Sequence, residues 1–149
     1  MDAATLQRVA AAVTPAVMVS ACGLLALGLD NQAARMTTRI RDLAREARAL
    51  PPDATRRAAV LAEIGILVRR HTLYGRALLS NYAALLLFVL TSALSLMGDR
   101  TAWVATLPLV TLGLGVLMLV AMAVSALLAI RLSGEAIALE VADVGKPPT

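Results

Sequence analysis

The chain has 149 residues, of which 59% are hydrophobic, and its mean hydropathy is +0.77. Because a soluble domain usually has about 45–50% hydrophobic residues, this composition excludes an ordinary water-soluble protein. The net charge of +4 would suggest nucleic acid as a partner in a soluble protein. Here nearly all basic residues are arginines beside apolar runs. Arginines in such positions hold the orientation of the spans and contact anionic lipid headgroups. We expect membrane lipids as partners, and no nucleic acid.

Residues that carry enzyme chemistry are scarce. The single cysteine, Cys22, excludes a disulfide or a cysteine-based metal site within one chain, and the single histidine, His71, lies in an apolar stripe. No phosphate-binding glycine loop and no catalytic triad can be assembled from the sequence. We therefore expect no enzymatic activity, no metal and no cofactor.

The first apolar run extends from Val9 to Leu29, and Pro15 interrupts it. Proline removes a backbone donor and disfavours helical geometry in the residue before it. We therefore expect an interfacial segment at residues 1–14 and a first transmembrane span at 15–31. The pattern leaves open whether residues 5–14 lie on the membrane or cross it.

Residues 32–76 are predicted to form a basic helical hairpin that continues the first two spans. Apolar residues recur four and three apart on both sides of Pro51-Pro52, which is the spacing of packed helices. Two such helices joined by a short turn are expected to pack antiparallel. The stripes are Leu29, Ala33, Met36, Ile40, Leu43, Ala47 and Leu50, then Val60, Ile64, Leu67, His71, Tyr74 and Leu78.

The second span is expected at residues 77–97, an external turn at 98–102 and the third span at 103–132. The tail at 133–149 is acidic, and it either docks on the basic hairpin or stays solvated. The predicted fold class is an all-α membrane protein with three transmembrane helices and a cytoplasmic antiparallel helical hairpin formed by extensions of the first and second spans.

The distribution of basic residues predicts the orientation. Ten arginines lie between Asp30 and Arg76, and Arg131 and Lys146 follow the third span, whereas only Arg8 and Arg100 lie on the other side. Cytoplasmic loops carry the excess of Lys and Arg. We therefore expect a multi-pass protein of the bacterial inner (cytoplasmic) membrane, with its N-terminus outside and its C-terminus cytoplasmic.

Three groups of residues are candidate functional positions. Polar groups near the cytoplasmic ends of the spans either fix helix register or form the mouth of a pathway, because a polar group in lipid must pair or face water. Basic residues of the hairpin are candidates for lining a vestibule or for contacting lipid. Small residues in the spans are candidates for close helix packing and homo-oligomerisation. In that order, the groups are Asp30, Asn31, Arg76 and Asn81; Arg35, Arg39, Arg41 and Arg45; and Ala16, Ser20, Gly23, Gly113, Ala121 and Ser125.

The segment from Thr14 to Leu25, followed by Asn31, Arg35 and the run Arg39 to Leu43, resembles the bacterial DUF2721 family of uncharacterised membrane proteins. Arg76-Ala77-Leu78-Leu79 at the start of the second span is similar to that family too. The resemblance covers about residues 5–132. It implies a small three-span inner-membrane protein and no catalytic residues. The chain has Asn31-Gln32 where family members have Asn-Arg, so no role of that basic position is carried over.

Two non-enzymatic functions remain open from the sequence. A homo-oligomer could form an ion channel whose first helix lines a pore below an arginine-rich vestibule. Alternatively, the protein is a membrane-anchored interaction module whose hairpin docks a partner protein or anionic lipid. The sequence does not choose between these functions.

Overall fold

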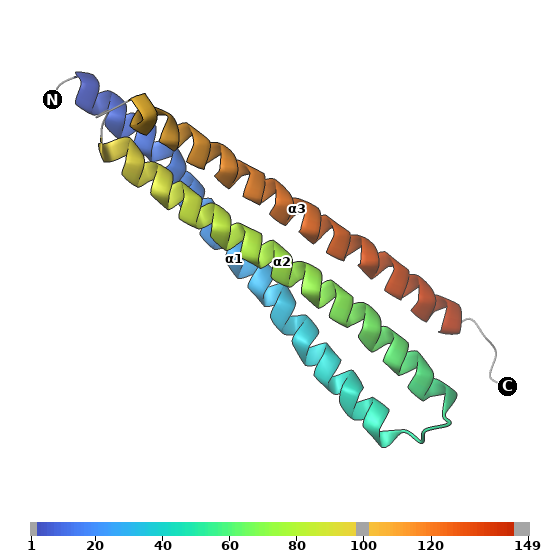
Figure 1. Cartoon of the computed structure of the whole chain (residues 1–149). Coiled ribbons are helices and arrows are strands. Elements are labelled where there is room, and N and C mark those ends of the chain that lie inside the picture. Colours follow the sequence, from blue (N-terminus) through green and yellow to red (C-terminus); the bar gives the residue numbers. More distant parts are fainter. Residues whose placement is uncertain (1–2, 98–101, 145–149) are drawn as a thin grey trace.

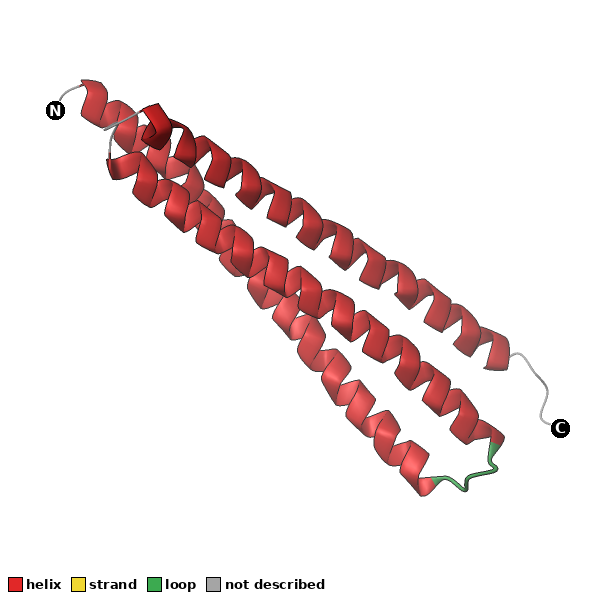
Figure 2. Cartoon of the chain, in the orientation of Figure 1, coloured by secondary structure: helices red, strands yellow, loops and turns green. Residues whose placement is uncertain are grey.

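The computed structural model describes residues 3–97 and 102–144, with side chains at Leu6, Ala10, 12–96 and 106–132. These residues form three helices: α1 (Ala3–Ala49), α2 (Thr55–Met97) and α3 (Ala102–Val144). Figure 2 shows that, in this part of the chain, only the short loop at 50–54 between α1 and α2 is not helical.

Each helix is longer than a membrane is thick. At about 1.5 Å per residue, the 47 residues of α1 extend about 70 Å, more than twice the roughly 30 Å of a bilayer core. Pro15 is buried inside α1 and does not end the helix. The segment before Pro15 therefore belongs to the same helix as the first span, and its position on or across the membrane stays a prediction.

The central helix of the bundle is α2, which packs against both α1 and α3. Figure 1 shows α1 crossing behind α2 and then running with it to the 50–54 loop, while α3 runs alongside α2. The N-terminal ends of α1 and α3 and the C-terminal end of α2 lie together at one end of the molecule, and the 50–54 loop lies at the other.

Three buried clusters hold the helices together. At the 50–54 end, α1 and α2 pack through Leu43, Ala47, Val60 and Leu67, which belong to the two apolar stripes. In the middle, α1, α2 and α3 meet around Met36, Tyr74 and Ala129, with Leu29 and Leu73 against them. Towards the other end, the core is formed by Cys22, Ala84 and Phe88, with Met18, Val19, Leu85, Leu112, Met118 and Leu119 packed around them.

The apolar parts of the helices leave large side chains uncovered. Leu24, Leu79 and Leu109 are each more than 70% exposed. Burying such a side chain stabilises by about 1.5–3 kcal/mol, so a surface of this kind requires a lipid environment. Three helices are long and apolar enough to span a membrane: their candidate segments are Ala12–Ala49, Thr55–Leu96 and Thr106–Leu132. The all-helical class with three such helices is confirmed.

Two predicted segments lie partly or wholly outside the described residues. Of the external turn, residues 98–101 are not described. The tail begins inside α3, which continues past the third span to Val144. The side chains of residues 133–149 lie outside the description, so the docking of the tail on the hairpin stays a prediction.

Candidate functional site

The four polar residues predicted to act together are found in different environments. Asn81 is fully buried, whereas Asp30, Asn31 and Arg76 are exposed. Among the described side chains, no ion pair joins Asp30 to Arg76. No hydrogen bond or ion pair between these four residues is present in the described part of the chain, so their joint role stays a prediction.

Asn81 instead joins two spans. Its Nδ2 donates a hydrogen bond of 2.9 Å to the backbone carbonyl of Cys22 on α1. Its Oδ1 is buried and has no hydrogen-bond partner in the described part of the chain. A polar contact of this kind between membrane helices is worth about 0.6 kcal/mol on average, so it fixes the register of α1 against α2 more than it adds stability. The sequence indicated a register contact for Asn81 but not its partner.

A second polar contact joins α2 to α3. The hydroxyl of Thr91 lies 2.8 Å from that of Thr111, and both hydroxyls also bond to carbonyls of their own helices. Ser92 and Ser95 likewise donate to the carbonyls of Phe88 and Thr91. These hydroxyls therefore donate their hydrogens within the described helices.

The small residues predicted for helix packing lie mostly on the surface of the single chain. A Cβ added to Gly23 or Gly113 would meet nothing within 4 Å. The glycine that does allow close approach is Gly115, where an added Cβ would lie 2.7 Å from the ring of Phe88. Their packing between copies of the chain stays a prediction. Of the six, Ala16, Ser20, Gly23 and Gly113 are exposed, and Ala121 and Ser125 are half-buried.

The candidate basic residues of the hairpin all point outward. Arg39 forms a 3.1 Å ion pair with Glu63 across the two helices, and Arg45 pairs with Asp42 on its own helix. These side chains are exposed, and exposed pairs contribute about 0–1 kcal/mol. Arg35 and Arg41 are exposed as well, and no ion pair with another described side chain is present for either.

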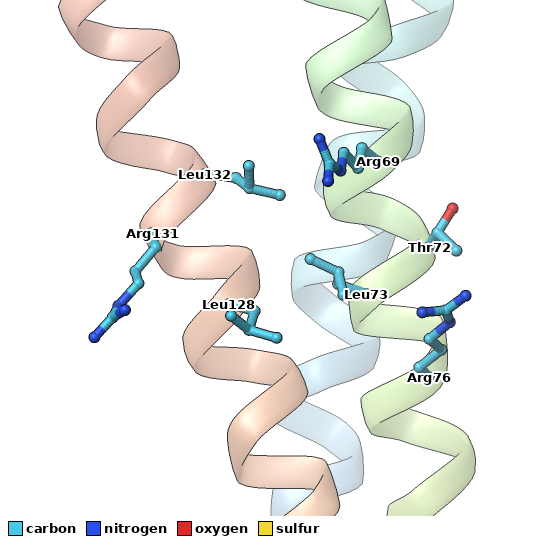
Figure 3. A pocket seen from close by; sticks show the side chains of 7 residues that line it. All are labelled: Arg69, Thr72, Leu73, Arg76, Leu128, Arg131 and Leu132. Atoms are coloured by element: carbon cyan, nitrogen blue, oxygen red, sulfur yellow. The ribbon is translucent and has the colours of Figure 1, made fainter.

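An open pocket of about 470 Å³ lies between α2 and α3, at the point where the apolar part of each helix ends. Figure 3 shows Leu73 of α2 facing Leu128 and Leu132 of α3, with Arg69 on the α2 side of the gap. The remaining lining residues are Thr72, Arg76 and Arg131. The sequence placed Arg76 and Arg131 near the membrane surface but did not indicate that they share a pocket with Arg69.

Chemistry-bearing side chains do not gather elsewhere in the described part of the chain. The residues searched contain no group of three or more His, Cys, Asp or Glu that would hold a metal ion. The one free cysteine, Cys22, is buried between the spans. The arrangement offers basic surfaces and small-residue faces, which are the features of binding and assembly.

Three helices that are long and apolar enough to span a membrane are compatible with a multi-pass membrane protein. The model of the family described as "protein of unknown function (DUF2721)" matches residues 12–139. The match covers most of the chain, so the protein belongs to this family, as the resemblance indicated. Searches of curated proteins and of solved structures found no match.

Proposed function

We propose that this protein is a non-enzymatic, homo-oligomeric protein of the bacterial inner membrane whose basic hairpin docks an acidic partner protein on the cytoplasmic side. The observation that carries the proposal is the division of the hairpin surface. Its apolar stripes are buried against each other around Leu43 and Val60, while its arginines are exposed except Arg57 and Arg70, which are half-buried. The surface left for an external partner is therefore basic.

The cytoplasmic position of the hairpin rests on the positive-inside rule. Ten arginines lie between Asp30 and Arg76, and the end of α2 opposite the hairpin is close to the start of α3. Short loops rich in Lys and Arg stay in the cytoplasm, and this sets the orientation of the spans. The same rule puts the N-terminus outside.

A protein suits the far end of the hairpin better than a lipid headgroup does. Because α1 continues without a break, Arg41 and Arg45 lie about 17 and 23 Å along the helix from Asp30. Exposed charges are screened over about 8 Å at physiological salt. Arginines at this distance from the membrane surface act on soluble acidic groups rather than on phospholipids.

Homo-oligomerisation is supported by the outward face of α1. Ala16, Ser20 and Gly23 are exposed there, on the side turned away from the other two helices. Small residues allow membrane helices to approach closely, and close packing is what drives their association in lipid. A second copy of the chain would therefore find a ready contact face.

The docking proposal is tested by quantitative affinity purification of the full-length protein from its native membrane. The double variant Arg41→Glu with Arg45→Glu is expected to lose a defined set of acidic proteins, because two attractive charges become repulsive. The matched variant Arg41→Lys with Arg45→Lys is expected to keep them. The same proteins recovered from all three forms, with equal membrane insertion, would overturn the proposal.

A channel is the second candidate, and one specific observation favours it. Exposed positions follow one another four and three apart along α1 from Ala16 to Arg45. An oligomer with this face on its axis would have a narrow pore of small residues opening into an arginine-lined vestibule that concentrates anions. The stripe is Ala16, Ser20, Gly23, Leu27, Asn31, Ala34, Thr38, Arg41 and Arg45.

Conductance measurements test the channel. Purified protein in planar bilayers is expected to conduct anions, and Arg41→Glu or Arg45→Glu is expected to reduce anion selectivity, since each replaces a positive charge on this stripe with a negative one. Silent bilayers throughout voltage and pH sweeps would contradict the channel and leave the docking proposal untouched.

A further inference from the structure

The pocket between α2 and α3 has two chemically different parts. Leu73, Leu128 and Leu132 form an apolar floor between the helices, as Figure 3 shows. Arg69 and Arg76 are seven residues apart on α2, and therefore share a face of that helix. Arg131 of α3 also lines the pocket, although Figure 3 shows its guanidinium turned away from the gap between the helices.

The three arginines have a charge that the described part of the chain does not neutralise. No acidic side chain lines the pocket, and none of the three arginines forms an ion pair with another side chain that the structure describes. All three are exposed, so they keep the freedom to turn toward a ligand. A guanidinium presents a planar fork of donors that fits phosphate oxygens in a bidentate manner. The hydroxyl of Thr72 is already donated to the carbonyl of Val68, so the arginines are the donors of this pocket.

The position of the pocket along the helices identifies the ligand class. Arg76 directly precedes the apolar run that begins at Ala77, and Arg131 directly follows the apolar run that ends at Ile130. Both helices therefore pass from hydrocarbon to water beside the pocket. This is the level of lipid phosphates, and the leucine floor continues from it toward the bilayer core.

We propose that this groove binds an anionic glycerophospholipid, whose phosphate is held by Arg69, Arg76 and Arg131 and whose acyl chain lies on Leu73, Leu128 and Leu132. The volume of about 470 Å³ is in the range of small-molecule sites and accommodates a headgroup with the first part of a chain. The site needs no partner protein, so its test is independent of the docking function proposed for the hairpin.

The first test compares phosphatidylglycerol with phosphatidylcholine on the intact, detergent-solubilised protein by native mass spectrometry. We expect retention of phosphatidylglycerol over phosphatidylcholine. The single variants Arg69→Gln, Arg76→Gln and Arg131→Gln are each expected to weaken phosphatidylglycerol binding about fivefold. Matched controls are Arg41→Gln and Arg45→Gln, which remove equally exposed charges far along the hairpin and are expected to bind as the wild type does.

The second test separates a lipid from a free phosphate compound. Leu128→Ser changes no charge and alters a side chain that is already 46% exposed, so the fold is expected to persist. It is expected to weaken phosphatidylglycerol binding, and inorganic phosphate alone is expected to give no thermal stabilisation.

Three outcomes would overturn the proposal. The first is equal retention of the two lipids by the wild type, and the second is an equal loss of phosphatidylglycerol in the Arg41→Gln control. The third is stabilisation by inorganic phosphate that Leu128→Ser does not change, because it would identify a soluble phosphate compound as the occupant.

Discussion

Gly115 of α3 lies against the ring of Phe88 of α2, and replacing this glycine by alanine tests the packing of the spans directly. The added Cβ would lie 2.7 Å from Cε1, 3.0 Å from Cδ1 and 3.1 Å from Cζ of Phe88. Since carbon atoms pack best at about 3.5–4.0 Å, the ring or α3 must move by about 1 Å. Phe88 is fully buried among Cys22 and Ala84, so its ring has little space to move into.

Overpacking of a filled core costs about 1–3 kcal/mol. Gly115→Ala is therefore expected to raise the population of the opened state by roughly 5- to 150-fold. Gly113→Ala is the matched control, because it makes the same change two residues earlier on α3, where a Cβ meets nothing within 4 Å. It is expected to be neutral in detergent conditions that keep the protein monomeric.

The readout is the alkylation of Cys22, the only cysteine of the chain, which is fully buried in the same cluster as Phe88. Thiol labelling reports each opening of this core. Gly115→Ala is expected to label much faster than the wild type. Adding Phe88→Leu to Gly115→Ala is expected to cost less than Phe88→Leu alone, because a smaller side chain relieves the contact. Equal labelling rates for the wild type, Gly113→Ala and Gly115→Ala would refute the reasoning.

Three further predictions concern the hairpin, the threonine contact and the topology. Leu43→Ala is expected to destabilise the pairing of α1 and α2 by about 2–5 kcal/mol, because Leu43 is 1% exposed; limited proteolysis near the 50–54 loop is expected to accelerate while the spans stay inserted, and an unchanged cleavage rate would argue against this core. In unfolding titrations, the double-mutant cycle of Thr91→Val and Thr111→Val is expected to give a coupling energy near 0.6 kcal/mol and at most about 1.7 kcal/mol. A coupling energy of zero would show that their 2.8 Å contact does not stabilise the protein. Asp53→Cys in a Cys22→Ser background is expected to react with a membrane-impermeant thiol reagent only after the membrane is opened, and labelling in intact cells would reverse the predicted orientation.

Much of the fold was predictable because its causes are local in the sequence. The apolar runs predicted three spans, and the four-and-three spacing of residues such as Leu43 and Val60 predicted which faces of α1 and α2 are buried. These patterns depend on helix periodicity alone. The continuity of α1 through Pro15 was not predicted. A proline does not end a helix when its neighbours compensate, and compensation by other helices cannot be read from one segment.

The candidate site was less predictable because it depends on how separate helices are aligned. Asn81 was singled out from the sequence and grouped with Asp30 and Arg76 at the cytoplasmic ends of the spans, whereas its hydrogen bond joins it to Cys22. Its hydrogen bond reaches a backbone carbonyl, and every residue has one, so no sequence pattern marks that partner. The same limit applies to Gly115, since nothing in its local sequence distinguishes it from Gly113.

The sequence by itself determined that the protein is helical, lies in a membrane and has its charge concentrated between the first two spans. Hydropathy, periodicity and arginine count are properties of consecutive residues, and lipid and water act on them directly. Only the tertiary structure decided that α2 is the central helix, that Phe88 packs on Gly115, and that Arg69, Arg76 and Arg131 line one groove. These facts depend on the rotation and register of α3 against α2, which are set by many weak contacts between residues far apart in the chain.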